Sequence, residues 1–163
     1  RVLAAARANK QGATVEEVLL AATRVRTRME LLFTVDTLEY LHRGGRIGGA
    51  TRLLGTLLNF KPLLMVEGGK IDAWGRARSR RKSLEALVTE AQRRLAGRRP
   101  VELGVIHTPE DPDAEMLTSL AMDQLQPQRL YTGLISPVLG THGGPGSIGI
   151  VFYTESDDVG IYG

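Results

Sequence analysis

LLMVEGGKIDAWGRA (63–77) is the stretch that decides the fold of this chain. Two runs rich in strand-forming residues flank Gly68-Gly69, a pair that suits the positive φ angles of a tight primed turn, so the stretch predicts a β-hairpin. Elsewhere the pattern predicts strands that alternate with helices. Because the two strands of a hairpin are antiparallel, this chain cannot build a purely parallel sheet. The sequence therefore predicts a mixed α/β (α+β) domain in which helices cover a mixed β-sheet.

The chain after the hairpin continues the alternation. Ser79 is a hydroxyl cap for a long basic helix over about 80–96, whose apolar residues recur on one face and which Gly97 ends. VELGVIHT (101–108) predicts a buried strand. The remaining predicted elements are a helix from about 111 to 125, a short strand over 129–133 and a final strand over 147–154.

The chain before the hairpin predicts helices on either side of one strand. Residues 1–29 are expected to be helical, because hydroxyl, acidic and apolar residues follow the pattern of capped amphipathic helices. MELLFTVD (29–36) predicts a buried strand. Asp36 is then expected to cap a short helix that stops at Gly44-Gly45, and a further helix is expected over 47–58.

The composition limits the classes of function. A chain of 163 residues is long enough to bury one core, and 42% hydrophobic with 24% charged residues is ordinary for a globular protein. The lack of cysteine excludes disulfides, thiolate metal sites and cysteine nucleophiles. The most apolar stretch, 53–66, is too short to span a bilayer, and the start has no signal-peptide pattern. We therefore expect a cytoplasmic protein without an integral membrane segment.

Positive charge is concentrated in residues 76–99, although the net charge of the chain is only +3. This segment holds nine lysines and arginines and two glutamates. Such a surface suits an acidic protein, a phosphate or a nucleic acid. A charge run along a helix is more often a solvated face, so both interpretations stay open.

The segment DTLEYLHRGGRIGG (36–49) is the first candidate site. Two glycine pairs bracket Arg46 and allow the backbone to approach a ligand closely. The planar guanidinium of an arginine suits a carboxylate or a phosphate. The simpler interpretation is a helix end followed by a turn, with Arg46 in solvent.

The segment THGGPGSIG (141–149) is the second candidate site. It is expected to be a glycine-rich loop in which His142 is accessible and the neighbouring backbone N–H groups are free to bind an anion. The simpler interpretation is a structural loop. Gly144, Gly146 and Gly149 match a dinucleotide fingerprint, but no helix is predicted after them, so a nucleotide site is not expected. Acids near His107 fit helix caps better than a metal site.

Three segments, taken in order, resemble the DegV family of fatty-acid-binding proteins, also described as B subunits of bacterial fatty-acid kinase. They are FTVDTLEYLHRGGRIG (33–48), FKPLLMVEGGKIDAWGRARSRRKSLEAL (60–87) and ISPVLGTHGGPGSIGIVFY (135–153). The resemblance covers about residues 1–153. The third segment reads THGGPG where many members have HTGPG, a change that keeps the histidine and the Pro-Gly step.

The resemblance implies a two-lobed fold of which this chain is the C-terminal lobe. Residues 1–29 correspond to connecting helices, 30–154 to the lobe and 155–163 to a polar tail, while the N-terminal lobe is absent. His142 would bind the fatty-acid carboxylate and Arg46 would lie near it. The expected lipid-binding set also includes neighbours of His142; the full set is His142, Arg46, Thr141, Gly143 and Gly146.

The resemblance also implies a function. The protein would bind a long-chain fatty acid as its ligand, without a cofactor, and present the carboxylate to a separate kinase catalytic subunit for phosphorylation. It would have no catalytic activity of its own, would not bind nucleic acid and would touch a membrane at most transiently. We expect four arginines to dock the kinase subunit: Arg76, Arg78, Arg80 and Arg81.

Two other functions stay open at this stage. A basic nucleic-acid-binding module fits the isoelectric point near 9.5, but the stacking aromatics that such a surface uses are few. A hydrolase or transferase that uses His142 would need a nucleophile or second acid beside it, and the spacing of residues indicates none.

Overall fold

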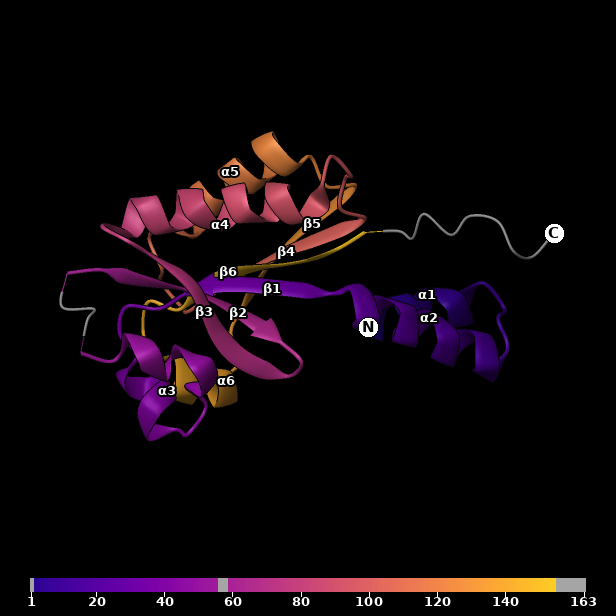
Figure 1. The fold of residues 1–163 in the computed structure, drawn as a ribbon. Coiled ribbons are helices and arrows are strands. Elements are labelled where there is room, and N and C mark those ends of the chain that lie inside the picture. Colours follow the sequence, from indigo (N-terminus) through magenta and orange to yellow (C-terminus); the bar gives the residue numbers. More distant parts are fainter. Residues whose placement is uncertain (1, 56–58, 155–163) are drawn as a thin grey trace.

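One six-stranded sheet organises the molecule, which a computed structural model describes over residues 2–55 and 59–154. The strand order is β3-β2-β1-β6-β4-β5, and only β4 and β5 pair in parallel. The predicted mixed sheet is thus confirmed (Figure 1). The strands are β1 (Glu30–Thr34), β2 (Lys61–Glu67), β3 (Lys70–Ala77), β4 (Glu102–His107), β5 (Arg129–Leu134) and β6 (Ile148–Tyr153).

The predicted hairpin is present as β2 and β3. Glu67 and Lys70 are opposite each other, and the two residues between them, Gly68 and Gly69, have φ angles of 56° and 79°. Positive φ at both central positions is what a primed two-residue turn requires, and glycine adopts it without strain. The hairpin forms one end of the sheet, and β2 joins it to β1.

Two long helices cover one face of the sheet: α4 (Arg80–Leu95) and α5 (Ala114–Leu125) (Figure 1). The Ser79 side chain accepts a hydrogen bond from the Lys82 backbone N–H, so the predicted cap of α4 is confirmed. Leucines of both helices pack on alternate residues of the strands. The fully buried members of this core include Leu32, Leu84, Leu87, Leu103, Leu117 and Ile150.

Shorter elements lie on the other face: α3 (Glu39–Arg43), the 3₁₀ helix η1 (Gly48–Leu53) and α6 (Pro137–Gly143). The helix expected over 47–58 is present over Gly48–Leu53 as the 3₁₀ helix η1; residues 56–58 lie outside the described part. Gly48 has a φ of 52°, which an α-helix does not contain, and a Cβ there would overlap with the Ile71 carbonyl of β3. The glycines therefore serve close packing against the edge strand.

The sequence predicts that Asp36 caps α3, and this prediction is wrong. Leu38 is the N-cap residue, and the Glu39 backbone N–H donates instead to the Thr37 hydroxyl at 3.2 Å. The Asp36 carboxylate forms an ion pair with Lys61 at 2.7 Å, 25 residues away. The Asp36 carboxylate therefore binds the distant Lys61 ammonium and not the backbone N–H groups at the start of α3.

Two helices, α1 (Val2–Lys10) and α2 (Val15–Arg28), form a hairpin beside one end of the sheet (Figure 1). Thr14 and Glu17 build the capping box of α2. Arg7 joins α1 to the sheet through an ion pair with Glu102 and a 2.8 Å hydrogen bond to the Tyr131 hydroxyl. The predicted tail over 155–163 lies outside the described residues.

Across the described residues, no helix combines the length and the apolar character needed to cross a membrane.

Candidate functional site

An apolar cavity of about 390 Å³ lies between the sheet and the shorter helices α3 and α6. Strand alternation explains its walls: Leu31 and Phe33 line it, whereas Leu32 between them belongs to the core under α4 and α5. Only a few polar side chains join the wall, and His142 and Arg46 are two of them. The other apolar lining residues are Leu41, Val66, Ile71, Ile106, Ile135, Val138, Leu139 and Ile148.

His142 lies in the last turn of α6, with its ring against Gly44 of the other glycine-rich segment. A Cβ on Gly44 would overlap with the Nδ1 atom of the ring. That Nδ1 is buried and forms no hydrogen bond to any described residue. Buried polar atoms are nearly always hydrogen-bonded. His142 thus lines the cavity and has one ring nitrogen, beside Gly44, whose hydrogen-bonding capacity no described residue uses.

The first three residues of the predicted glycine-rich segment 141–149 belong to the helix α6, and the rest lies between α6 and β6 or in β6. The Ser136 hydroxyl caps α6, and Pro137 occupies its first turn. The backbone N–H of Gly140 donates to Ser136 and that of Gly144 donates to Gly140, each at 2.8 Å. These amides are used within the helix, so the expectation of free N–H groups around His142 is wrong at these two positions.

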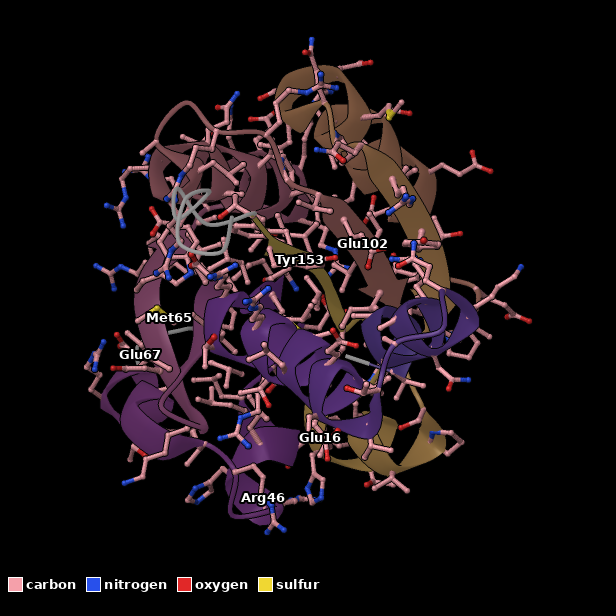
Figure 2. All side chains as sticks on the ribbon, turned by 90° about the vertical axis from the view of Figure 1, so that its right-hand side faces the viewer. Glu16, Arg46, Met65, Glu67, Glu102 and Tyr153 are labelled. Carbon is pink, nitrogen blue, oxygen red and sulfur yellow. The ribbon has the colours of Figure 1, made fainter. Side chains whose placement is uncertain are left out.

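The other predicted lipid-binding residues divide between several places. Gly143 and Arg46 line the apolar cavity with His142. Arg46 is exposed, its guanidinium donates to the Gly44 carbonyl at 3.0 Å, and Figure 2 shows it at the lower tip of the molecule. Thr141 is exposed and donates to the Val138 carbonyl. Gly146 lies on a second cavity.

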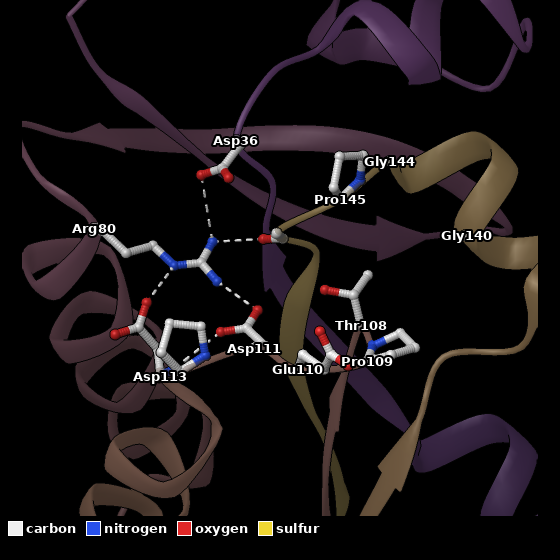
Figure 3. A pocket seen from close by; sticks show the side chains of 12 residues that line it. Asp36, Arg80, Thr108, Pro109, Glu110, Asp111, Asp113, Gly140, Gly144 and Pro145 are labelled. Atoms are coloured by element: carbon white, nitrogen blue, oxygen red, sulfur yellow. Dashed lines mark hydrogen bonds and ion pairs between the residues drawn. The ribbon is translucent and has the colours of Figure 1, made fainter.

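The second cavity is larger, about 560 Å³, and has several charged side chains in its wall (Figure 3). Arg80 lines it and donates to Asp113 and Asp111, at 2.9 Å each, and to the Gly146 carbonyl at 2.5 Å. Asp113 makes no side-chain cap for α5, contrary to expectation. The two aspartates bind Arg80 instead, although Asp111 also accepts from the Asp113 backbone N–H.

The remaining arginines of the predicted docking set are on the surface. Arg76 stacks over the Phe60 ring with 4.7 Å between the guanidinium carbon and the ring centre. Arg81 pairs with Glu85 at 3.1 Å, one turn along α4. Arg78 is exposed between β3 and α4. Arg80 differs from them, because its side chain is only 18% exposed.

No group of three or more His, Asp or Glu side chains within residues 2–55 and 59–154 is arranged to hold a metal ion.

Comparison with known proteins gives one consistent family. A family model described as "Uncharacterised protein, DegV family" matches residues 1–155. A DegV domain-containing protein of Deinococcus radiodurans is 36% identical over 150 residues, which are 92% of this chain and 53% of that protein. One of Streptomyces coelicolor is 39% identical, over 91% of this chain and 53% of that protein. The chain thus spans about half the length of the curated relatives it matches.

Two solved structures are similar to this chain. A fatty-acid-binding DegV family protein from Thermus thermophilus superposes with a TM-score of 0.88 at 33% identity, over 94% of this chain and 55% of that one. DegV from Bacillus subtilis, described as a fatty acid binding protein, gives a TM-score of 0.75 at 26% identity, over 94% and 55% of the two chains.

Proposed function

The chain belongs to the DegV family, and from that premise we propose that it is a lobe of a protein that binds a long-chain fatty acid. One observation carries the proposal: an apolar cavity of about 390 Å³ is lined by His142, a histidine whose buried Nδ1 has no partner among the described residues. Each buried CH₂ group of an acyl chain contributes about 0.8 kcal/mol. Apolar walls supply affinity, and a few polar groups fix the headgroup.

His142 and Arg46 are the proposed headgroup residues. A carboxylate that leaves water needs donors, because an unpaired buried charge is costly. The imidazole can donate from a ring nitrogen, and the exposed Arg46 guanidinium adds positive charge at the same cavity. Gly143 leaves room for the Ser147 side chain, which also lines the cavity. In this proposal Thr141 and Gly146 act indirectly, through the structure of α6 and of the loop that follows it.

The cavity is open on the side of α6 and β5. Val138 and Leu139 line it, yet they are 71% and 59% exposed, and Leu134 nearby on β5 is 63% exposed. Large apolar patches that face solvent mark surfaces that another partner covers. Because the chain spans about half of its relatives, we propose that the N-terminal half of the full-length protein closes this side over the acyl chain.

The proposed role is to carry the acid, without catalysis, to a separate kinase subunit that phosphorylates the carboxylate. Arg46, one of the two proposed headgroup residues, is exposed, which suits a carboxylate presented at the surface. We propose that Arg76, Arg78 and Arg81 dock this subunit, because charged surface groups raise the association rate. Because ATP, the usual phosphate donor, is cytoplasmic, we propose that the bound acid is phosphorylated in the cytoplasm.

The test is His142→Ala in the full-length protein, with two readouts: the dissociation constant for palmitate and the rate of acyl-phosphate formation with the kinase subunit. Loss of one charge-assisted hydrogen bond costs about 1.5–3 kcal/mol, or roughly 10- to 100-fold in affinity. Phosphoryl transfer should fall further, because it requires an oriented oxygen.

His42→Ala is the matched control, since His42 is exposed on α3, and it should bind palmitate like the wild type. A wild-type protein that does not bind palmitate contradicts the proposed function. Normal binding and turnover in His142→Ala would reduce this residue to a structural role.

A further inference from the structure

Arg80 joins four segments that are far apart in the sequence (Figure 3). It begins α4, and its Nε and Nη2 atoms bind Asp113 and Asp111 of the loop before α5. Its Nη1 atom donates to the Gly146 carbonyl, between α6 and β6, and lies 3.7 Å from the Asp36 carboxylate that follows β1. The planar fork of an arginine holds several acceptors in fixed directions, which the single ammonium of a lysine does not.

Burial makes this arrangement rigid rather than adaptable. The Arg80 side chain is 18% exposed, and the Asp111 side chain only 2%. Charge-assisted hydrogen bonds in such a protected position are stronger than those in water. Arg80 is therefore held from two sides, and the Gly146 carbonyl is held with it.

Two of the joined segments are packed together along their length. The Asp36 carboxylate occupies the space where Gly146 would carry a Cβ, and the Tyr40 ring does the same at Gly144. The His142 ring occupies that space at Gly44. From Asp36 to Gly44 the contacts advance along one segment while they go back from Gly146 to His142 on the other, so the two segments run antiparallel. They connect the Arg80 cluster directly to the residues of the apolar cavity.

We propose that Arg80 is a positioning residue, which fixes the His142 ring and the segment of Arg46 through Gly146 and Asp36. This inference rests on the proposed function and deepens it, since it attributes the selectivity for a carboxylate headgroup to the Arg80 contacts. A site built to bind a polar group rejects an analogue that lacks the group only while its own donors are held in place. Loss of Arg80 should loosen the donors and leave the acyl walls intact.

The experiment compares two ligands of equal chain length, palmitate and hexadecanol, with full-length wild-type and Arg80→Gln proteins. We expect the wild type to prefer the acid. In Arg80→Gln this preference should fall about tenfold, while the dissociation constant of hexadecanol changes less than about threefold. Arg80→Lys keeps the charge but not the fork, so it should lie close to Arg80→Gln.

Arg93→Gln is the matched control, because Arg93 is on the same helix and its side chain is 70% exposed; it should keep the wild-type preference. Asp36→Asn is a second, milder variant, with a half-exposed side chain, and it decides the question if thermal melting shows Arg80→Gln to be unfolded. An unchanged preference in Arg80→Gln or Asp36→Asn, or an equal loss for both ligands, overturns the inference. A wild type without any preference for the acid contradicts the proposed headgroup site instead.

Discussion

The two faces of the sheet are built from the same strands but packed in different ways. On the α4 and α5 face, side chains such as Leu84 and Leu87 are completely buried in a continuous core. On the α3 and α6 face, a cavity remains, and two residues of its wall, Val138 and Leu139, face solvent. The first face is covered by helices of this chain, whereas the second leaves apolar side chains exposed to solvent.

Under the proposed function, this difference separates the residues that stabilise the fold from those that bind the lipid. Close packing contributes to stability because each buried methyl group has partners on all sides. In the proposed function, the apolar side chains of the open wall make such packing contacts with a bound acyl chain instead. Adjacent residues of β1 serve both purposes, Leu32 in the core and Leu31 on the cavity. Substitutions should therefore affect folding on one face and lipid affinity on the other.

The largest effect is expected from Leu87→Ala, on the closed face. The free energy of unfolding should fall by about 2–5 kcal/mol, because truncation leaves a void in a packed core. Urea unfolding measures this loss. Val138→Ala is the comparison on the open face: it should cost less than about 1 kcal/mol in unfolding, since Val138 is 71% exposed, but weaken palmitate binding. Equal destabilisation by both variants would remove the distinction between the faces.

A smaller effect, on binding alone, is expected from Gly44→Ala. The added methyl group overlaps with the His142 ring, which must move from the position it holds beside Gly44. Gly44 has a negative φ of −77°, so the substitution causes no backbone strain and the effect is steric. We expect palmitate affinity to fall about tenfold, as for one lost hydrogen bond of about 1.4 kcal/mol.

Gly140→Ala provides the control for that steric effect. It adds the same methyl group two residues before His142, in open space on α6. Alanine is also the better helix former, so α6 should keep or gain stability. Comparable loss of affinity in both alanine variants would show that the position of the His142 ring is not what matters. Isothermal titration with palmitate compares the two.

The sequence predicted the elements whose signals are local. Alternation and a glycine pair marked the hairpin, and Ser79 marked the start of α4. It was only partly right over 136–146, where four glycines favoured a loop with one helical turn over the helix-start signal of the Ser136 cap and Pro137, and where α6 has seven residues. Glycines there permit close contacts with side chains of a distant segment, which no local pattern reveals.

The sequence indicated which residues line the candidate site but not which distant segments contact one another around it. His142 and Arg46 do line one cavity. Arg80 and Arg81 look equivalent in the sequence, yet adjacent helix positions differ by about 100° around the axis, so one side chain is buried among aspartates and the other is in solvent. Such a difference depends on which segments pack against each side of α4.

The smallest effect should come from charge on α4, away from the cavity. Glu90 is 9% exposed, and both of its carboxylate oxygens accept hydrogen bonds from Arg93 at 2.7 Å. Arg94 adds another bond to Glu90 and joins it to Glu30 of β1. The Arg93 hydrogen bonds lower the pKa of the Glu90 carboxyl, and Arg94 contributes in the same direction against the effect of burial.

The sign of the resulting pH dependence follows from this lowered pKa. An unperturbed glutamate titrates near pH 4.3, so the unfolded chain takes up a proton on Glu90 at a higher pH than the folded one. The stabilisation is complete above about pH 5 and is lost as the pH falls through the folded pKa.

Glu90→Gln should therefore cost about 1 kcal/mol at pH 7, between the values of exposed pairs and of protected charged hydrogen bonds. In urea unfolding the two proteins should converge as the pH falls to 3, and palmitate affinity at pH 7 should be equal, because Glu90 belongs to the closed face. A constant difference in unfolding free energy between pH 7 and pH 3 would mean that packing of the side chain, not its charge, stabilises α4.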